Sequence, residues 1–400
     1  MTPDRLFARK RGAEPLRVVI CPDSFKGSLD AAGVAAAMAR GVRDACADTR
    51  VCVLPMADGG EGTARITAQA LGWEWLETAV AGPDGEVLTA GWGLDRTAGH
   101  AVLDVASACA LNRIPATRRN PWQLHTSGVG QLIRSALDTG TRHLLIGLGG
   151  SGTVDGGAGM LHALGLRFLD RNGRSLPPHP AGLAGLDHID ANGLDPRLDG
   201  THLIVLGDVD NPLTGPNGAA TVFGPQKGLS DDDIPAMDAH LARLARGMDR
   251  AGLLRRPADT PGAGAAGGLG FALTCVLGAE PRMGAAYLAD LTGLDAAIAN
   301  ADLVLTGEGQ LDTQTARGKV IAEVLKRARA HATPVAAIAG RIVDTGGDST
   351  QLGLQAARAL CDGSITPQQA MDDPAYWIAV RTRELVDDLV GGHPGVGRDT

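Results

Sequence analysis

The chain has 400 residues, of which 44% are hydrophobic and 20% are charged. These fractions are typical of a globular protein, and the length favours two domains over a single core. The formal net charge of −8 disfavours nucleic acid or an anionic membrane as a partner, because both would require a basic surface. A small anionic substrate is compatible with this charge, since a few cations and backbone N–H groups are enough to bind it.

The cysteines and the first residues bear on the cellular compartment. The six cysteines form no C-x-x-C pair and stand at no zinc-type spacing with a histidine, which predicts free thiols. Met1–Arg17 is charged and lacks the apolar core of a secretory signal. No apolar run reaches the length needed to span a membrane. We therefore predict a cytoplasmic protein.

Two strand–loop–helix units follow one another near the N-terminus. An apolar, β-branched run at 16–21 predicts a buried strand, which leads into the loop Pro22–Ser28 and a helix over 29–46 capped by Ser28. A second strand leads into the polar loop Ala57–Thr63 and another helix. This alternation is typical of a parallel sheet, in which ligands bind at the carboxyl ends of the strands. We therefore expect both loops to lie at a ligand site.

The middle of the chain differs in pattern from its two ends. From about residue 79, short strand-like pieces alternate with turns, whereas the strand–loop–helix rhythm returns with a strand at Leu303–Thr306 and a loop at Gly307–Asp312. This pattern predicts two α/β domains. The first is a discontinuous parallel-sheet domain of residues 1–78 and 290–400, and the second is an inserted mixed α/β domain of residues 79–289.

A glycine-rich loop follows the strongest strand of the middle part. The run 147–157 contains several glycines, and backbone without side chains can approach a phosphate closely and donate several N–H groups to it. Ser151 and Thr153 add hydroxyl donors, and Asp155 could hold Mg²⁺ or orient a ligand. The alternative interpretation is a tight connection in which the glycines serve packing alone.

The same loop also admits a dinucleotide-binding interpretation. Gly147, Gly149 and Gly152 match the pattern G-x-G-x-x-G, and Asp170 follows at about the distance of the ribose-binding acid. A second match at 262–267 shows how little specificity the pattern has in a chain with 56 glycines. A Rossmann-type NAD-dependent oxidoreductase is therefore kept as an alternative.

Acidic residues and lysines gather where predicted strands end. Phosphoryl transfer needs carboxylates to bind Mg²⁺ and to take or orient the proton of the attacking hydroxyl, although a single loop Asp is as often a turn cap. A loop lysine flanked by serines, as Lys26 is, suits a carboxylate or phosphate group, and Lys227 is a similar candidate. The acids at predicted strand ends are Asp23, Asp58, Glu61, Asp208, Asp210, Glu308 and Asp312.

Seven ordered blocks of sequence together resemble the bacterial glycerate kinases that act on D-glycerate. They cover nearly the whole chain after Arg17, which makes them far more specific than any single glycine motif. The blocks are Pro22–Ser28, Ala57–Thr63, Gly149–Ser151 with Asp155–Gly157, Asp208–Val209 with Asn211–Leu213, Val222–Gly228, Pro261–Gly268 and Thr306–Asp312.

This resemblance implies a flavodoxin-like domain built from both chain ends, an inserted α/β domain, and an active site in the cleft between them. It also implies an ATP- and Mg²⁺-dependent kinase that phosphorylates a hydroxyl of D-glycerate, giving 2-phosphoglycerate and ADP, with no nucleic acid or membrane partner. On this basis the predicted catalytic residues are Asp208 and Lys26, and the predicted metal ligands are Asp155 and Asp208. The predicted substrate-binding residues are Ser24, Lys26, Asp58, Glu61, Asn211 and Asp312. The predicted nucleotide-binding residues are Gly149, Gly150, Ser151, Thr153, Lys227 and Glu308.

The chain departs from the family pattern at three positions and matches it more weakly over Asp104–Leu111. Gly152, Val154 and Gly207 stand where Ala, Asn and Cys are usual. These departures leave a related hydroxy acid open as the substrate, and the missing Asn at position 154 would suit a non-catalytic carboxylate-binding protein. The sequence does not predict an oligomeric state.

Overall fold

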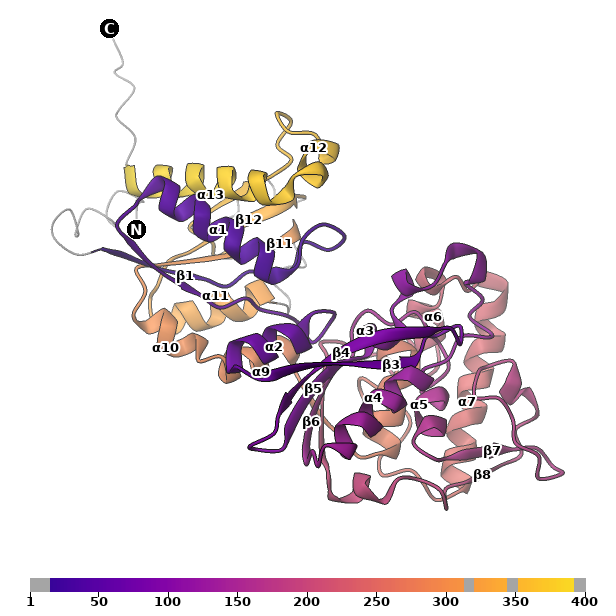
Figure 1. Ribbon diagram of the computed structural model, residues 1–400. Coiled ribbons are helices and arrows are strands. Elements are labelled where there is room, and N and C mark those ends of the chain that lie inside the picture. The colour runs from indigo at the N-terminus through magenta and orange to yellow at the C-terminus, as the bar shows by residue number, and fades with distance from the viewer. Residues whose placement is uncertain (1–14, 313–319, 344–351, 392–400) are drawn as a thin grey trace, which may run out of the picture. The chain divides into compact units, whose positions relative to one another are not determined.

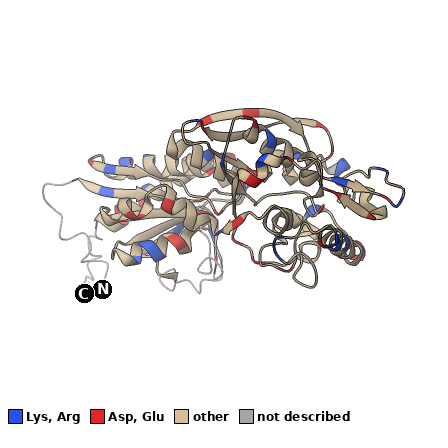
Figure 2. Cartoon of the chain, turned by 90° about the horizontal axis from the view of Figure 1, so that it is seen from below, with Lys and Arg blue, Asp and Glu red and all other residues tan. Residues whose placement is uncertain are grey.

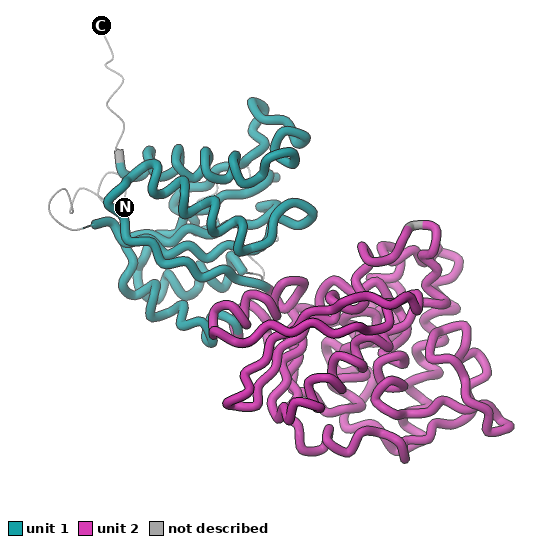
Figure 3. Tube along the Cα trace, viewed as in Figure 1, with its two compact units in different colours: residues 1–57, 288–400 teal, residues 58–287 magenta. Residues whose placement is uncertain are grey.

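The computed structural model describes residues 15–312, 320–343 and 352–391. The chain divides into two compact units, unit 1 with residues 1–57 and 288–400, and unit 2 with residues 58–287 (Figure 3). Unit 2 therefore begins earlier than the change of pattern near residue 79. The reason is that helix α2 (Thr63–Leu71) packs on strands of the unit 2 sheet.

Unit 1 is built on a sheet of five parallel strands in the order β2-β1-β11-β12-β13. This is the flavodoxin-like order of a doubly wound sheet. The prediction of a parallel α/β sheet formed by both ends of the chain is confirmed. The strands are β1 (Leu16–Ile20), β2 (Thr49–Val53), β11 (Leu303–Leu311), β12 (Val335–Ile342) and β13 (Ala356–Ala359).

Helices cover both faces of the unit 1 sheet. Helices α1 (Ala31–Ala45) and α13 (Pro374–Gly391) pack side by side on one face, and α10 (Leu294–Ala299) and α11 (Val320–Ala330) lie on the other (Figure 1). Apolar side chains of α1, α13 and the central strands form one buried core. The short helix α12 (Pro367–Asp372) precedes α13.

Two local predictions in unit 1 were wrong. The first helix is capped by Asp30, whose carboxylate accepts the N–H of Gly33 at 2.7 Å, and not by Ser28. Phe25 and Leu29 exchange backbone hydrogen bonds of 2.8 and 3.0 Å, so these residues form a closed turn before the helix.

The predicted loop at 307–312 is mostly strand. Strand β11 continues to Leu311 and pairs with β12 along this stretch, where glycines let the two backbones approach closely. A Cβ atom at Gly307 would come within 2.4 Å of the carbonyl oxygen of Ile338, and one at Gly340 within 2.5 Å of that of Gly309. These glycines therefore serve close strand pairing.

Unit 2 contains a mixed sheet of six strands in the order β10-β9-β6-β5-β4-β3. Strands β5, β6, β9 and β10 are parallel, whereas β3 and β4 run antiparallel to their neighbours. In register, Asp104 lies beside Gly147, and Gly147 lies beside Leu206. The strands are β3 (Glu74–Ala81), β4 (Val87–Asp95), β5 (His100–Asp104), β6 (His143–Gly147), β9 (His202–Leu206) and β10 (Glu280–Arg282).

The two faces of the unit 2 sheet are covered differently. Helix α2 packs over β4 and β5, where Ala68 lies close to Gly93. The alternate residues Trp92 and Leu94 belong to the large core under α4 and α5. The remaining elements are α3 (Val105–Cys109), α4 (Ser127–Asp138), α5 (Ala158–Ala163), the hairpin β7 (Arg167–Leu169) with β8 (His188–Asp190), α6 (Ala219–Phe223), α7 (Ile234–Arg250), α8 (Ala265–Gly270), a π-helix (Phe271–Val276) and α9 (Gly284–Leu291).

The distribution of charged residues and the state of the cysteines agree with what the composition predicts. Figure 2 shows acidic and basic residues interspersed over the helices and loops in that view. All six cysteines are free thiols. Within the described ranges, no helix combines the length and apolarity that crossing a bilayer requires.

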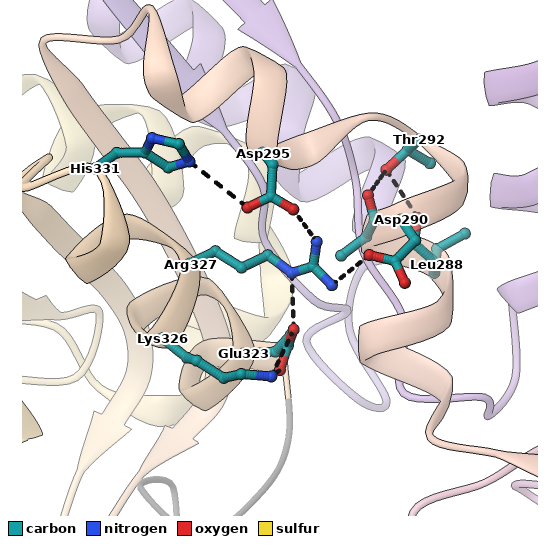
Figure 4. Close-up of polar contacts among 9 residues, drawn as sticks. Leu288, Asp290, Thr292, Asp295, Glu323, Lys326, Arg327 and His331 are labelled. Carbon is teal, nitrogen blue, oxygen red and sulfur yellow. Dashed lines mark hydrogen bonds and ion pairs between the residues drawn. The ribbon is translucent and has the colours of Figure 1, made fainter.

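One buried guanidinium ties several helices of unit 1 together. Arg327 on α11 forms ion pairs with Asp290 and Glu323, each at 2.7 Å, and with Asp295 on α10 (Figure 4). The Arg327 side chain is only 10% exposed. His331 extends the cluster, with its Nε2 atom 3.8 Å from the Asp295 carboxylate.

Candidate active site

Glycine-rich loops pack against one another at the carboxyl ends of the parallel strands of unit 2. The acidic loop (Asp58–Gly62) accepts a hydrogen bond at its Gly59 carbonyl oxygen from the N–H of Gly149, at 3.2 Å. A Cβ atom at Gly149 would lie 2.5 Å from the Cα of Gly60, and one at Gly59 would lie 2.6 Å from the carbonyl oxygen of Leu206. The absence of side chains is therefore what lets this loop lie on the ends of β6 and β9.

A buried carboxylate from β5 holds the end of the acidic loop. Asp104 accepts the N–H of Gly62 at Oδ2 and the N–H of Ala64 at Oδ1, both at 2.9 Å. Burial raises the pKa of Asp104 to about 7; the two hydrogen bonds oppose this shift, and the charge of Glu61 adds to it. Sequence reasoning did not single out Asp104, although an Asp at the end of a predicted strand was the same signal that selected Asp208.

The glycine loop (Gly149–Gly157) encloses a buried lysine. Lys227 is 3% exposed, and its ammonium donates hydrogen bonds to Ser151 Oγ at 2.8 Å and to the Thr153 carbonyl oxygen at 2.9 Å. Burial lowers the pKa of this ammonium to about 8, against the opposing effects of Cys109 and Asp155. Lys227 thus supports the glycine loop from its inner side, where it can add positive charge beneath a bound anion.

A third loop (Gly262–Gly268) closes over the lysine. Ala266, Gly267 and Gly268 all have left-handed backbone conformations. The carbonyl oxygen of Gly267 accepts the N–H of Gly156 at 3.1 Å. A Cβ atom at Gly267 would lie 1.9 Å from the carbonyl oxygen of Thr153 and 3.0 Å from Lys227 Nζ. This loop therefore needs glycine at 267 to close over the lysine.

The geometry speaks against the predicted metal role of Asp155. This carboxylate is fully buried and accepts four hydrogen bonds, from the backbone N–H groups of Thr126, Gly157 and Gly159 and from the Thr126 hydroxyl, at 2.8 to 3.1 Å. These donors occupy both oxygens and fix the start of α5. A buried carboxylate satisfied in this way stabilises the loop from inside.

Asp208 lies beyond the end of β9, at the edge where the acidic loop lies. Its Oδ1 atom accepts the N–H of Gly284, at 2.8 Å, at the start of α9. A Cβ atom at Gly284 would come within 2.3 Å of the carbonyl oxygen of Asp58, so Gly284 brings the Asp208 carboxylate next to the acidic loop. Asn211 instead braces its own loop, since its Nδ2 donates to the carbonyl oxygen of Asn217 at 2.9 Å.

The remaining predicted site residues belong to unit 1. The loop after β1 carries Ser24 and Lys26, and it is joined to β11 by the hydrogen bond from Asp23 N to the Gly307 carbonyl oxygen at 2.8 Å. Lys26 is exposed, and the neighbouring strand carries Glu308. Asp312 accepts a hydrogen bond from Gln310 at 2.9 Å. Strands β1 and β11 flank the switch point of this sheet, which is where doubly wound sheets bind ligands.

No preformed metal cage is present in the described part of the chain, where no three His, Cys, Asp or Glu side chains converge. This does not argue against Mg²⁺, which keeps several waters and is commonly held by one or two carboxylates together with substrate phosphates. Asp208, a half-buried residue beside the acidic loop, carries the carboxylate that such a site requires.

The structure contradicts the dinucleotide-binding alternative. The Asp170 carboxylate accepts the N–H groups of Asn172 and Arg174, at 2.8 and 2.9 Å, within the turn of its own hairpin. Gly147 ends β6, but α5 begins only at Ala158, so the glycines do not open a helix as that motif requires.

Val154 and Gly152 are two of the departures from the family pattern. The Val154 side chain is fully buried in the core of unit 2, so the departure at this position is a packing feature. At the neighbouring departure, a Cβ atom on Gly152 would lie 2.8 Å from the Cα of Leu111. The observed backbone therefore favours glycine over the usual alanine.

The protein has a parallel doubly wound sheet, a separate mixed sheet and glycine-rich loops at strand ends. These features are typical of α/β enzymes that bind their ligands in loops at the carboxyl ends of the strands. The Glycerate kinase family model matches residues 18–390. The chain belongs to this family, and it is an enzyme, a kinase whose family implies ATP as a substrate. The predicted family resemblance is thus confirmed, and the non-catalytic alternative is not supported.

Similar proteins match along nearly their whole length. A glycerate kinase of Bacillus subtilis is 40% identical over 374 residues, covering 94% of this chain and 98% of that protein. A glycerate 2-kinase of Escherichia coli is 41% identical over 382 residues, covering 96% and 100%. A crystal structure assigned as glycerate kinase 2 from Salmonella typhimurium LT2 superposes with a TM-score of 0.80 at 39% identity, covering 95% of this chain and 99% of that one.

Proposed function

We propose that the protein transfers the terminal phosphoryl group of ATP to the 2-hydroxyl of D-glycerate, giving 2-phosphoglycerate and ADP. The position of transfer is supported by the similarity to a glycerate 2-kinase. The observation that carries the proposal is the packing of Asp208, the acidic loop and the glycine loop at one sheet edge. Phosphoryl transfer needs just these parts, namely a carboxylate beside the acceptor and donors around the phosphates.

The ATP phosphates would bind over the glycine loop. Gly149 and Gly150 present backbone without side chains, and Ser151 and Thr153 carry hydroxyl groups on buried side chains, with Thr153 fully buried. Lys227 supplies positive charge from beneath the same loop through its contacts with Ser151 and Thr153. Glu308 of unit 1 is a further proposed nucleotide contact.

Asp208 would accept or orient the proton of the attacking hydroxyl. The N–H of Gly284, at the start of α9, donates a hydrogen bond to one oxygen of the Asp208 carboxylate and so fixes the orientation of this group. Asp208 is also the proposed protein ligand of Mg²⁺, which when bound would neutralise charge on the transferring phosphates. Asp155 is a poorer candidate for a ligand, since both of its oxygens accept hydrogen bonds from backbone N–H groups.

The substrate carboxylate would bind to Lys26 with help from Ser24, because an exposed ammonium next to a hydroxyl suits that group. Asp58, Glu61, Asn211 and Asp312 are proposed as further polar contacts of the substrate. We expect the enzyme to act in the cytoplasm on small molecules, without a nucleic acid or membrane partner.

An ADP-release assay with Mg-ATP and a panel of acceptors tests the proposal. The panel is D-glycerate, L-glycerate, lactate, tartronate and glycerol, and phosphorus NMR of the product identifies the phosphorylated hydroxyl. We expect turnover with D-glycerate and a 2-phosphate product. Asp208→Asn should abolish turnover and keep the unfolding transition of the wild type; wild-type rates in this variant would remove Asp208 from the mechanism. Turnover with a different acid would retain the mechanism and change the substrate.

A further inference from the structure

The start of helix α2 lacks a capping side chain of its own. The helix begins after Gly62, which has a φ of +93° and carries no side chain that could accept the first backbone N–H groups. Asp104, distant in sequence, supplies both missing acceptors by binding the N–H groups of Gly62 and Ala64. The carboxylate does not cap α3, the helix that follows it directly.

The site of this carboxylate is closely fitted. Asp104 is 5% exposed and lies beside Gly147 on the adjacent strand. A Cβ atom at Gly147 would lie 2.8 Å from Asp104 Oδ1 and 2.9 Å from the carbonyl oxygen of Gly59. One small gap between two strand ends therefore holds both the carboxylate and the backbone of the acidic loop.

We propose that Asp104 is a positioning residue for the kinase reaction, which holds the acidic loop so that Asp58 and Glu61 face the substrate correctly. This inference rests on the proposed function. Asp104 acts at the far end of the loop from Gly59, whose carbonyl oxygen is held by Gly149 N. The loop is thus fixed at both ends. Of the two contacts, only the one made by the Asp104 carboxylate involves a group that can gain or lose a proton.

Ionisation of Asp104 gives this contact a dependence on pH. Burial and the charge of Glu61 raise the pKa of Asp104 to about 7, and the backbone N–H groups oppose the shift. Glu61 is the charged side chain that acts on it among the described residues. Above this pH both oxygens accept as parts of a charged carboxylate, whereas in the protonated form one oxygen carries a hydrogen and is a weaker acceptor for the facing N–H. Loop positioning should therefore weaken as the pH falls through about 7.

The experiment compares the pH profiles of kcat and KM for the acceptor in the wild type and in Asp104→Asn. In the wild type we expect kcat/KM to fall below pH 7. In Asp104→Asn, kcat/KM at pH 8 should be about 100-fold lower, since small displacements of a positioned group have effects of that size. The acid limb near pH 7 should be absent from this variant.

Asp95→Asn is the matched control. Asp95 also accepts two backbone N–H groups, those of Thr97 and Ala98 at 2.9 and 3.2 Å, in an exposed turn of the same unit. Its substitution should leave the pH profile of catalysis unchanged. Melting temperatures of both variants separate a loss of folded protein from a loss of positioning.

Three outcomes would overturn the inference. A folded Asp104→Asn enzyme with the wild-type kcat/KM and the wild-type acid limb would show that Asp104 serves stability alone. Absence of turnover by the wild type with every acceptor would overturn the proposed function and this inference with it. If Asp104→Asn does not fold, an acid limb away from pH 7 in the wild type itself would reject the role of Asp104.

Discussion

The ammonium of Lys227 lies 2.8 Å from the hydroxyl oxygen of Ser151 and donates a hydrogen bond to it from inside the protein. A second hydrogen bond reaches the Thr153 carbonyl oxygen at 2.9 Å. Lys227 therefore holds the glycine loop at two positions, Ser151 and Thr153, and its charge lies beneath the surface on which the phosphates are proposed to bind. This arrangement differs from a lysine that reaches out to the nucleotide.

Removal of the Lys227 ammonium should weaken ATP binding. Lys227→Met leaves two buried acceptors without their donor and takes away the charge, which we expect to raise KM for ATP by about 10-fold or more. Lys227→Arg should not restore binding, because even a Cβ added at Gly267 would lie 3.0 Å from Nζ, which leaves no room for the larger guanidinium. Lys326→Met, at an exposed lysine, is the control for net charge. A wild-type KM for ATP in Lys227→Met would refute the role.

The lowered pKa of Lys227 also predicts opposite trends for stability and binding. Because the pKa is about 8 in the folded protein and near 10.5 when unfolded, the folded state binds fewer protons between these values. The free energy of unfolding should therefore gain a contribution from this group as the pH rises above 8. ATP affinity should fall over the same range, because the ammonium loses its charge. Urea titrations and KM measurements between pH 7 and 10 test both trends.

Asp155→Asn distinguishes a structural carboxylate from a metal ligand. The amide can accept at only one atom, so at least one of the buried N–H groups now bound by Asp155 would lose its partner. We expect a loss of about 1–3 kcal/mol in the free energy of unfolding. The Mg²⁺ concentration for half-maximal activity should be unchanged in the folded variant. A large rise in that concentration at wild-type stability would restore Asp155 as a ligand.

The sequence predicted which residues lie at strand ends but not which side chains reach them from elsewhere. Asp208 and the glycine loop were found because each follows a recognisable buried strand. Asp104 was missed because its partners, Gly62 and Ala64, lie about forty residues away and are backbone groups with no sequence signature. Tertiary hydrogen bonds of this kind become visible only when the two segments are brought together.

Helix-capping rules also gave the wrong residue where two good capping residues lie close together in the sequence. Ser28 and Asp30 are both good helix caps, and the choice was made by the backbone pairing of Phe25 with Leu29, which keeps Ser28 inside a turn. Val154 stands in a glycine loop by sequence, yet its side chain packs into the core. A motif thus locates a loop without saying which of its side chains face the ligand.

A comparison of alanine substitutions at two left-handed glycines distinguishes the cost of backbone strain from the cost of a steric clash. Gly252 and Gly267 have φ values of +68° and +69°, but a Cβ atom at Gly252 would meet no atom within 4 Å. Gly252→Ala should lower the free energy of unfolding by about 1–2 kcal/mol through the left-handed conformation alone. Gly267→Ala adds a clash with the Thr153 carbonyl oxygen, so its loss of stability should be larger and its KM for ATP raised. Equal effects of the two substitutions in urea unfolding and kinetics would contradict the packing of the third loop on the glycine loop.

Arg327 should stabilise unit 1 by more than an ordinary surface ion pair does. Its guanidinium is 10% exposed and is shared by the carboxylates of Asp290, Asp295 and Glu323, whose mutual repulsion it screens. Arg327→Met should lower the free energy of unfolding by about 1–3 kcal/mol, because three like charges lose their common partner. Lys326→Met on the same helix, which removes one exposed pair with Glu323, should change it by less than about 0.5 kcal/mol. Added salt should recover part of the loss in Arg327→Met by screening the carboxylates, and equal losses in the two variants would show that the cluster contributes no more than an ordinary surface pair.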